Sequence, residues 1–216
     1  MTGDAECHNN GLESSASGGS TPLSPSWRLL LFTFVLLTCS GSGVVTQFPM
    51  PLGHQQLEMK SEIHELISKY CRLDYEGARL DAASWPKIEP LVWWKSNPDY
   101  TRIDVISLYA VDTEPSSSHG RYTVTVQYQL LGSYDFTAGY SRQAPGSVED
   151  VNYIVRETNG EWRISDADNY FPHPSRPAML KWLSDKIGTA QDEIAKTLYQ
   201  DALHKLQAQP TTPFAK

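Results

Sequence analysis

The chain has 216 residues and a formal net charge of −7. The charge is spread along the sequence without a basic block, so the electrostatic attraction that draws proteins to phosphate backbones is missing, and we expect no nucleic-acid partner. The length allows one domain or two small ones. Because about the first fifty residues differ in composition from the rest, one folded domain is favoured.

The region before the folded part is divided by composition. From Asn9 onward, residues 1–26 are mostly Ser, Gly, Pro and Asn, which bury too little apolar surface to offset the entropy lost on ordering. We therefore expect residues 1–26 to be disordered. Residues 46–54 form the expected linker to the folded part.

Residues 27–45 carry the targeting signal. After Arg28 the chain is apolar for about eleven residues, which fits the stretch of about 7 to 15 in a signal peptide and falls short of the roughly 20 that cross a bilayer. The tetrapeptide Leu-Leu-Thr-Cys that ends at Cys39 resembles the lipobox of bacterial lipoproteins, whose cysteine is acylated. Cys39 is then the lipid attachment residue. A lipoprotein, a plain secretory signal and an uncleaved anchor remain as alternatives.

The basic residues around this segment set its orientation. Arg28 precedes the apolar run, and no Lys or Arg follows before Lys60, so the positive-inside rule places the chain after the run outside the cytoplasm. We expect an exported protein whose partner is the membrane, with the folded domain anchored outside the cytoplasm, or else a periplasmic or secreted protein.

The folded part opens with a helical pattern. Apolar residues recur at helical spacing over residues 55–78, with charged residues largely off that stripe, which predicts an amphipathic helix of about six turns. Asp81 is placed to cap a second helix, which Pro86 and Pro90 keep short.

The period then changes to that of strands. Residues 103–111 are apolar on both faces, as in a central or covered strand, and residues 121–131 alternate as in a half-buried antiparallel strand. Alternation resumes over residues 151–155, after which Asn159-Gly160 supplies the two positive-φ positions of a tight hairpin.

Two helices are expected after the last strand. The prolines of residues 169–174 predict irregular backbone, and Ser175 is placed to cap a helix that Gly188 ends. Thr189 and Asp192 form a capping-box pattern that opens the last helix.

The order of these elements is a long helix, a short helix and antiparallel strands that end in the hairpin Val-Arg-Glu-Thr-Asn-Gly-Glu-Trp-Arg-Ile. Over residues 55–168 this order resembles the NTF2-like (SnoaL-like, cystatin-related cone) superfamily. The resemblance implies an α+β fold in which a long N-terminal helix packs on a curved antiparallel sheet, forming a cone that often holds a small apolar ligand. The chain departs from it through a C-terminal helical extension at residues 169–207 and a tail at 208–216.

The candidate catalytic residue is a single carboxylate. The family includes isomerases, dehydratases and cyclases as well as members without catalysis, so the site has to decide the function. An enzyme of this type needs a carboxylate or His buried in an apolar cavity. Asp74 lies one turn beyond Tyr70 on the apolar stripe and is the candidate acid, although a solvated position near the helix end is the favoured interpretation.

Aromatic residues are the candidate pocket lining. They are Tyr70, Tyr109, Tyr128, Tyr153 and Trp162. For Tyr109, Tyr128 and Tyr153, the favoured interpretation is that the rings fill the core and the hydroxyls reach water.

Neither a metal site nor a cofactor is predicted. No two of the histidines stand at metal-ligand spacing, and His119 and His173 are expected to be exposed. Cys71 is interpreted as a small buried hydrophobic residue.

Three functions from different classes remain. The favoured one is a non-catalytic domain outside the cytoplasm that binds a partner protein or a small apolar ligand. The second is a small acid/base enzyme that works in the cone. The third is a structural or assembly subunit, for example a homodimer, that uses the C-terminal helices.

Overall fold

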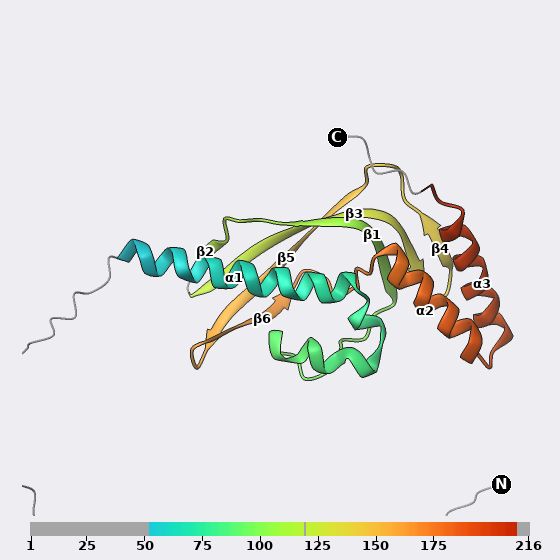
Figure 1. Ribbon diagram of the computed structural model, residues 1–216, viewed down its shortest axis with the longest axis horizontal. Helices are drawn as coiled ribbons and strands as arrows, with labels where there is room; N and C mark the ends of the chain where they lie inside the picture. Colours follow the sequence, from blue (N-terminus) through green and yellow to red (C-terminus); the bar gives the residue numbers. More distant parts are fainter. Residues whose placement is uncertain (1–51, 119, 211–216) are drawn as a thin grey trace, which may run out of the picture. The chain divides into compact units, whose positions relative to one another are not determined.

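The computed structural model describes residues 52–118 and 120–210 (Figure 1). Its elements are α1 (Leu52–Tyr75), the short 3-10 segments η1 (Ala78–Leu80), η2 (Ala82–Lys87) and η3 (Glu89–Leu91), β1 (Arg102–Val111), β2 (Ser116–Ser118), β3 (Arg121–Asp135), β4 (Gly139–Arg142), β5 (Val148–Thr158), β6 (Glu161–Ala167), α2 (Arg176–Thr189) and α3 (Glu193–Gln207). The predicted α+β class with an antiparallel sheet is confirmed.

The expectations for the N-terminal region fall outside the described residues. They are the disordered residues 1–26, the targeting segment 27–45 with Cys39, and the linker up to residue 51. Residues 52–54 of that linker are instead the first residues of α1. None of the helices in the described part of the chain combines the length and apolarity needed to cross a bilayer.

The sheet is open and antiparallel, with the strand order β1-β3-β5-β6. β3 is its longest strand, and β2 and β4 pair with the two ends of β3. β2 and β4 are not predicted by the sequence pattern, and the predicted strand corresponding to β3 ends at Leu131. The strand runs on to Asp135 because β4 supplies hydrogen-bond partners along that end.

β1 lies at the edge of the strand order, yet it is buried on both faces over Ile103 to Ile106. Its free edge is covered by residues 172–175, because the amides of Asp104 and Ile106 donate to the carbonyls of Pro172 and Pro174 at 2.9 and 3.0 Å. Proline cannot donate to a ladder but can accept from one. The expectation of a covered strand is confirmed for Ile103 to Ile106 but is wrong for the rest of β1, where Leu108 is 53% exposed.

The predicted tight hairpin between β5 and β6 is also confirmed. Asn159 and Gly160 have φ values of 55° and 80°, the left-handed conformation that a two-residue turn of this type requires. Asn and Gly adopt it at low cost, which is why this turn is visible in the sequence.

α1 lies along one face of the sheet and contacts β1 and β6 (Figure 1). Its buried residues meet the sheet in a cluster that we call the first core. The first core consists of Ile63, Ile67, Tyr70, Cys71, Ala78, Ile88, Leu91, Val92, Ile106, Val124, Val126, Tyr128, Val151, Tyr153, Val155 and Ile164. After α1, Asp81 caps η2 by accepting a hydrogen bond from the amide of Ala83, as expected.

The C-terminal helices pack against each other, and α3 also contacts β4 (Figure 1). Their buried side is the second core, formed by Leu80, Ile103, Val105, Tyr134, Tyr140, Met179, Trp182, Leu183, Ala202 and Leu206. Ser175 caps α2 through the amide of Ala178, as predicted.

The predicted capping box at the start of α3 is wrong. Thr189 is the last residue of α2, and Asp192 is itself the N-cap, accepting a hydrogen bond from the amide of Ile194. An N-cap Asp can satisfy a free amide of the first turn without a partner three residues away.

Candidate functional site

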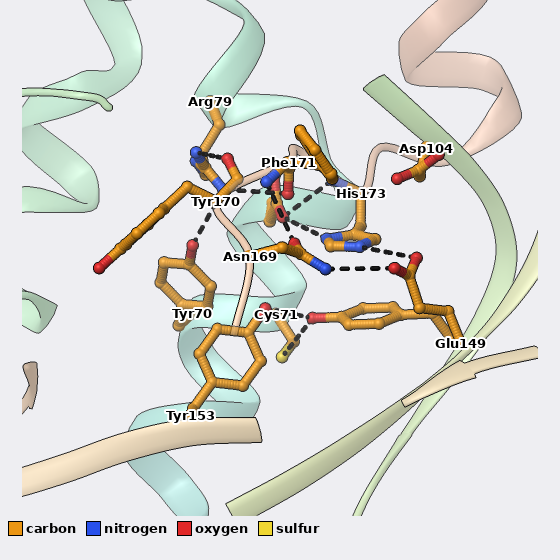
Figure 2. Close-up of polar contacts among 12 residues, drawn as sticks. Tyr70, Cys71, Arg79, Asp104, Glu149, Tyr153, Asn169, Tyr170, Phe171 and His173 are labelled. Atoms are coloured by element: carbon orange, nitrogen blue, oxygen red, sulfur yellow. Dashed lines mark hydrogen bonds and ion pairs between the residues drawn. The ribbon is translucent and has the colours of Figure 1, made fainter. Parts of the chain in front are cut away.

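Charged and polar side chains gather where the two cores meet (Figure 2). This group, called the polar cluster below, consists of Asp74 on α1, Arg79 on η1, Arg102 and Asp104 on β1, Glu149 on β5, and Asn169 and His173 between β6 and α2. Burying such groups is costly unless they are paired, so each contact within the cluster matters for the fold.

Asp74 and His173 are each only 1% exposed, so the expectations of a solvated Asp74 and an exposed His173 are both wrong. The cause is the segment between β6 and α2, which lies against β1 and the end of α1. The amide of His173 donates to Asp74 Oδ2 at 3.0 Å, and the amide of Ser175 donates to the carbonyl of Tyr75 at 2.8 Å. The helix end that should have met water meets this segment instead.

The His173 ring lies between two carboxylates. Its Nδ1 is 3.6 Å from Asp74 Oδ2, and its Nε2 is 3.8 Å from Glu149 Oε2. One face stacks on Tyr128, with ring centroids 3.9 Å apart and planes 5° apart. Burial alone would lower the pKa of His173, but Asp74 and Glu149 outweigh it and raise the pKa above its ordinary value.

The carboxylates of Asp104 and Glu149 share Arg102. The Arg102 guanidinium is 2.8 Å from Asp104 Oδ2 and 3.5 Å from Glu149 Oε1, and Ser133 donates to Asp104 Oδ1 at 2.6 Å. The contact with His173 lowers the pKa of Glu149, and the charge of Arg102 adds to that effect. Asp104 is fully buried, whereas Glu149 is partly exposed at the margin of the cluster.

Arg79 forms the other half of the cluster and is 2% exposed. Its guanidinium donates to the carbonyls of Tyr170 and Phe171, at 2.6 and 3.2 Å, and to the hydroxyl of Tyr70 at 3.2 Å. Figure 2 shows these contacts on the side of the cluster away from Glu149. Arg79 therefore binds the start of the segment between β6 and α2, and Asp74 binds its later part at His173.

Three of the expected pocket residues come together in the first core. The hydroxyls of Tyr128 and Tyr153 are hydrogen-bonded at 2.8 Å, Cys71 Sγ lies 3.4 Å from the Tyr128 hydroxyl, and the Tyr70 ring meets the edge of Tyr153. All four side chains are buried, so the rings fill the core as expected, but the hydroxyls of Tyr70, Tyr128 and Tyr153 contact other side chains, not water. Burial raises the pKa of the Cys71 thiol to about 12 and that of each tyrosine above its ordinary value.

The other two expected pocket residues lie at the margin. Tyr109 is half-buried, with its ring 6.4 Å from that of Tyr128. Trp162 packs on Tyr122 and donates to Glu62 Oε2 at 3.1 Å, in contact with α1 and away from the polar cluster.

Sequence reasoning did not find Asp104, Glu149, Arg79 or His173. Only Asp104 left a signal, because it is a charged residue within the strand pattern that is apolar on both faces. Glu149 occupies an ordinary strand position. His173 depends on a chain reversal that no local pattern encodes.

A separate groove of about 530 Å³ lies between the end of α1, the segments η1 and η2, and α2. Its lining carries charges of both signs around small residues. The lining residues are Leu73, Glu76, Gly77, Ala78, Leu80, Asp81, Ser84, Lys87, Ala178, Lys181, Trp182, Asp185, Lys186 and Thr189.

These features define an α+β domain with an open antiparallel sheet, a polar cluster at the junction of two cores, and a charged groove beside the cluster. No family model, characterised protein or solved structure matches the chain.

Proposed function

We propose that the chain is an exported or membrane-tethered, non-catalytic binding domain that engages a partner protein outside the cytoplasm. The proposal combines the targeting pattern of residues 27–45 with the state of the acid/base groups in the described domain. Partner binding then depends on the surface, and the interior serves to hold that surface in shape.

One observation carries this proposal. Asp74, His173 and Tyr128 have the right chemistry for acid/base work, but each is at most 1% exposed and each is in contact with other side chains of the domain. A catalytic acid or base has to come within hydrogen-bond distance of its substrate. Their burial against one another supports a structural role for these groups.

The groove supports a protein partner over a small apolar ligand. Lys181, Lys186 and Lys87 line it together with Glu76 and Asp185. Sites for small apolar ligands are lined mainly by apolar and aromatic side chains, whereas charges of both signs suit the polar surface of another protein and help to set its orientation.

The finer fold is part of the same proposal: we infer an NTF2-like cone. Support comes from the element order and from α1 lying along one face of the sheet. In this proposal, Tyr70, Tyr128 and Tyr153 occupy the space that a ligand takes in a ligand-binding cone.

The test is binding by the full-length protein in detergent. The partner is first captured from the envelope fraction of the host, then purified and titrated against the wild type and the double variant Lys181→Glu/Lys186→Glu. We expect the dissociation constant to rise about tenfold or more for the variant, since reversing charges at a contact opposes the partner's own charges.

The matched control is Lys69→Glu/Lys95→Glu, which makes the same charge change at two exposed lysines outside the groove. It should leave the dissociation constant within about twofold of the wild type. If both double variants weaken partner binding equally, the effect comes from the net charge of the protein and not from the groove. If the groove variant binds the partner as the wild type does, this groove is excluded as the binding site.

The acid/base enzyme remains the alternative, because the buried carboxylate that such an enzyme needs is present in Asp74. If a turnover is found that survives purification, Asp74→Asn decides the assignment. Activity lost with the fold intact would favour the enzyme, whereas activity unchanged would remove Asp74 from the reaction.

A further inference from the structure

Three residues of the polar cluster place potential metal-ligand atoms close together. His173, Glu149 and Asp104 each offer one donor atom, and these three atoms all lie within 4.8 Å of one another. They come from the segment before α2, from β5 and from β1. Figure 2 shows His173 and Glu149 directed toward each other, with Asp104 nearby.

The facing atoms of His173 and Glu149 lack hydrogen-bond partners within the described chain. Both ring nitrogens of His173 and the Oε2 atom of Glu149 are buried without a hydrogen bond. The Nε2 to Oε2 distance of 3.8 Å is too long for a direct hydrogen bond. It does fit two atoms that bind one ion at about 2.0–2.2 Å each, the usual length of zinc bonds to nitrogen and oxygen.

Neighbouring groups orient all three donors. Asp74 Oδ2 lies 3.6 Å from His173 Nδ1, which favours the proton on Nδ1 and leaves the lone pair of Nε2 facing Glu149. Asn169 donates to Glu149 Oε1 at 3.2 Å, and Ser133 donates to Asp104 Oδ1 at 2.6 Å. A carboxylate behind the histidine and hydrogen bonds to the ligating carboxylates are the usual supports of a metal site.

The net charge of the polar cluster is compatible with a bound cation. Three carboxylates, Asp74, Asp104 and Glu149, surround His173, and Arg102 supplies the single positive charge in contact with two of them. Arg79, buried in the same cluster, is a second positive charge near Asp74, so with a neutral His173 the cluster carries one net negative charge. Arg102 contacts Glu149 through Oε1, so Oε2 stays available to an ion.

We infer that His173, Glu149 and Asp104 bind one divalent transition-metal ion, for which Zn²⁺ is the best probe. One imidazole with two carboxylates suits Zn²⁺ better than Mg²⁺, which prefers oxygen ligands in an octahedral arrangement. The ion cross-links β1, β5 and the segment that leads to α2, so it fastens the C-terminal helices to the sheet. This inference stands independently of the binding function proposed above.

The experiment uses the full-length protein in detergent, stripped with a chelator and dialysed. Titration calorimetry with Zn²⁺ should give one ion per chain, and the melting temperature should rise by about 5–10 °C at a zinc concentration about a hundred times the dissociation constant. Mg²⁺ at the same concentration should produce no rise. The X-ray absorption spectrum of bound zinc should show one imidazole and oxygen ligands.

Glu149→Gln is the deciding variant, because this partly exposed side chain keeps its size and loses only the charge that faces His173 Nε2. We expect its zinc affinity to fall at least about tenfold. Asp150→Asn is the matched control, an exposed acidic residue one position along the same strand, and should bind zinc as the wild type does.

Two results would overturn the inference. Wild-type protein that takes up no zinc would mean that the cluster is balanced by a proton on His173 alone. Zinc bound equally by the wild type and Glu149→Gln, or a spectrum with sulfur ligands, would place the ion at other residues. If Glu149→Gln does not fold, the ligand types in the wild-type spectrum still decide.

Discussion

The two cores of the domain differ in the polar groups that they bury. In the second core, Tyr134 and Trp182 make ring contacts with each other and with the partly buried Tyr199, and the indole of Trp182 donates to the carbonyl of Leu80 at 3.2 Å. The first core instead encloses the hydroxyls of Tyr128 and Tyr153, which bond to each other.

β1 shows why the difference arises. Ile103 and Val105 belong to the second core, whereas Asp104 and Ile106 point to the other face of the strand. Asp104 therefore lies on the side of the first core, where Ser133 and Arg102 contact it. The second core holds a neutral polar pair, in which Gln209 donates to the Tyr140 hydroxyl at 2.8 Å, whereas the border of the first core holds charged pairs.

The largest expected effect comes from breaking the second core. Trp182→Ala should lower the free energy of unfolding by about 3–5 kcal/mol, because it removes a buried aromatic ring and leaves a cavity. Urea unfolding measures the change. Trp93→Ala, at a tryptophan that is 41% exposed, should cost less than about 1 kcal/mol, and equal losses for the two variants would contradict this account of the second core.

The next effect comes from the border of the first core. Asp74→Asn keeps the size of the side chain and an acceptor for the amide of His173, but it removes the charge that faces the imidazole. We expect a loss of about 1–3 kcal/mol in urea unfolding. Asp99→Asn, at an exposed aspartate, should stay within about 0.5 kcal/mol, and a similarly small change at Asp74 would show that its charge does not stabilise the cluster.

The buried tyrosines predict alkaline instability. Burial raises the pKa of Tyr70, Tyr128 and Tyr153, so the folded state holds their protons where the unfolded chain, with a pKa of about 10, releases them. Their contribution to stability is present below about pH 10 and is lost above it, at about 1.4 kcal/mol per pH unit for each tyrosine. Tyrosinate absorbance and circular dichroism should change together above pH 10. Ionisation of all tyrosines near pH 10 in a folded protein would contradict this.

The smallest expected effect is on the chemical reactivity of the Cys71 thiol. Because burial raises the pKa of its thiol to about 12, Cys71 should stay unmodified by iodoacetamide in the folded protein at pH 8 and react fully in urea. Mass spectrometry of the peptide that contains Cys71 separates this thiol from Cys7 and Cys39. Rapid labelling of folded protein would show that the first core opens readily.

Local patterns identified most of the secondary structure. The alternation of β3, the Asn159-Gly160 turn and the Ser175 cap each depend on neighbours in the sequence, and all three are present as predicted. β2 and β4 were missed, since each is short and exists through pairing with an end of β3.

The candidate site was predictable only in part. The tyrosines of the first core were found, since large aromatic residues at strand and helix spacing are buried by their own pattern. The positions of Asp74 and His173 were not, because both depend on residues 172–175 returning to the edge of β1.

The sequence by itself determined most of the elements, their order and the apolar faces that must be buried, because these follow from local propensity and from the period of apolar residues. The tertiary structure alone decided which charges are buried together. Asp74 and His173 are 99 positions apart in the chain, and no local preference brings their side chains into contact. These groups are removed from water because the two cores pack against each other, and once buried they must pair.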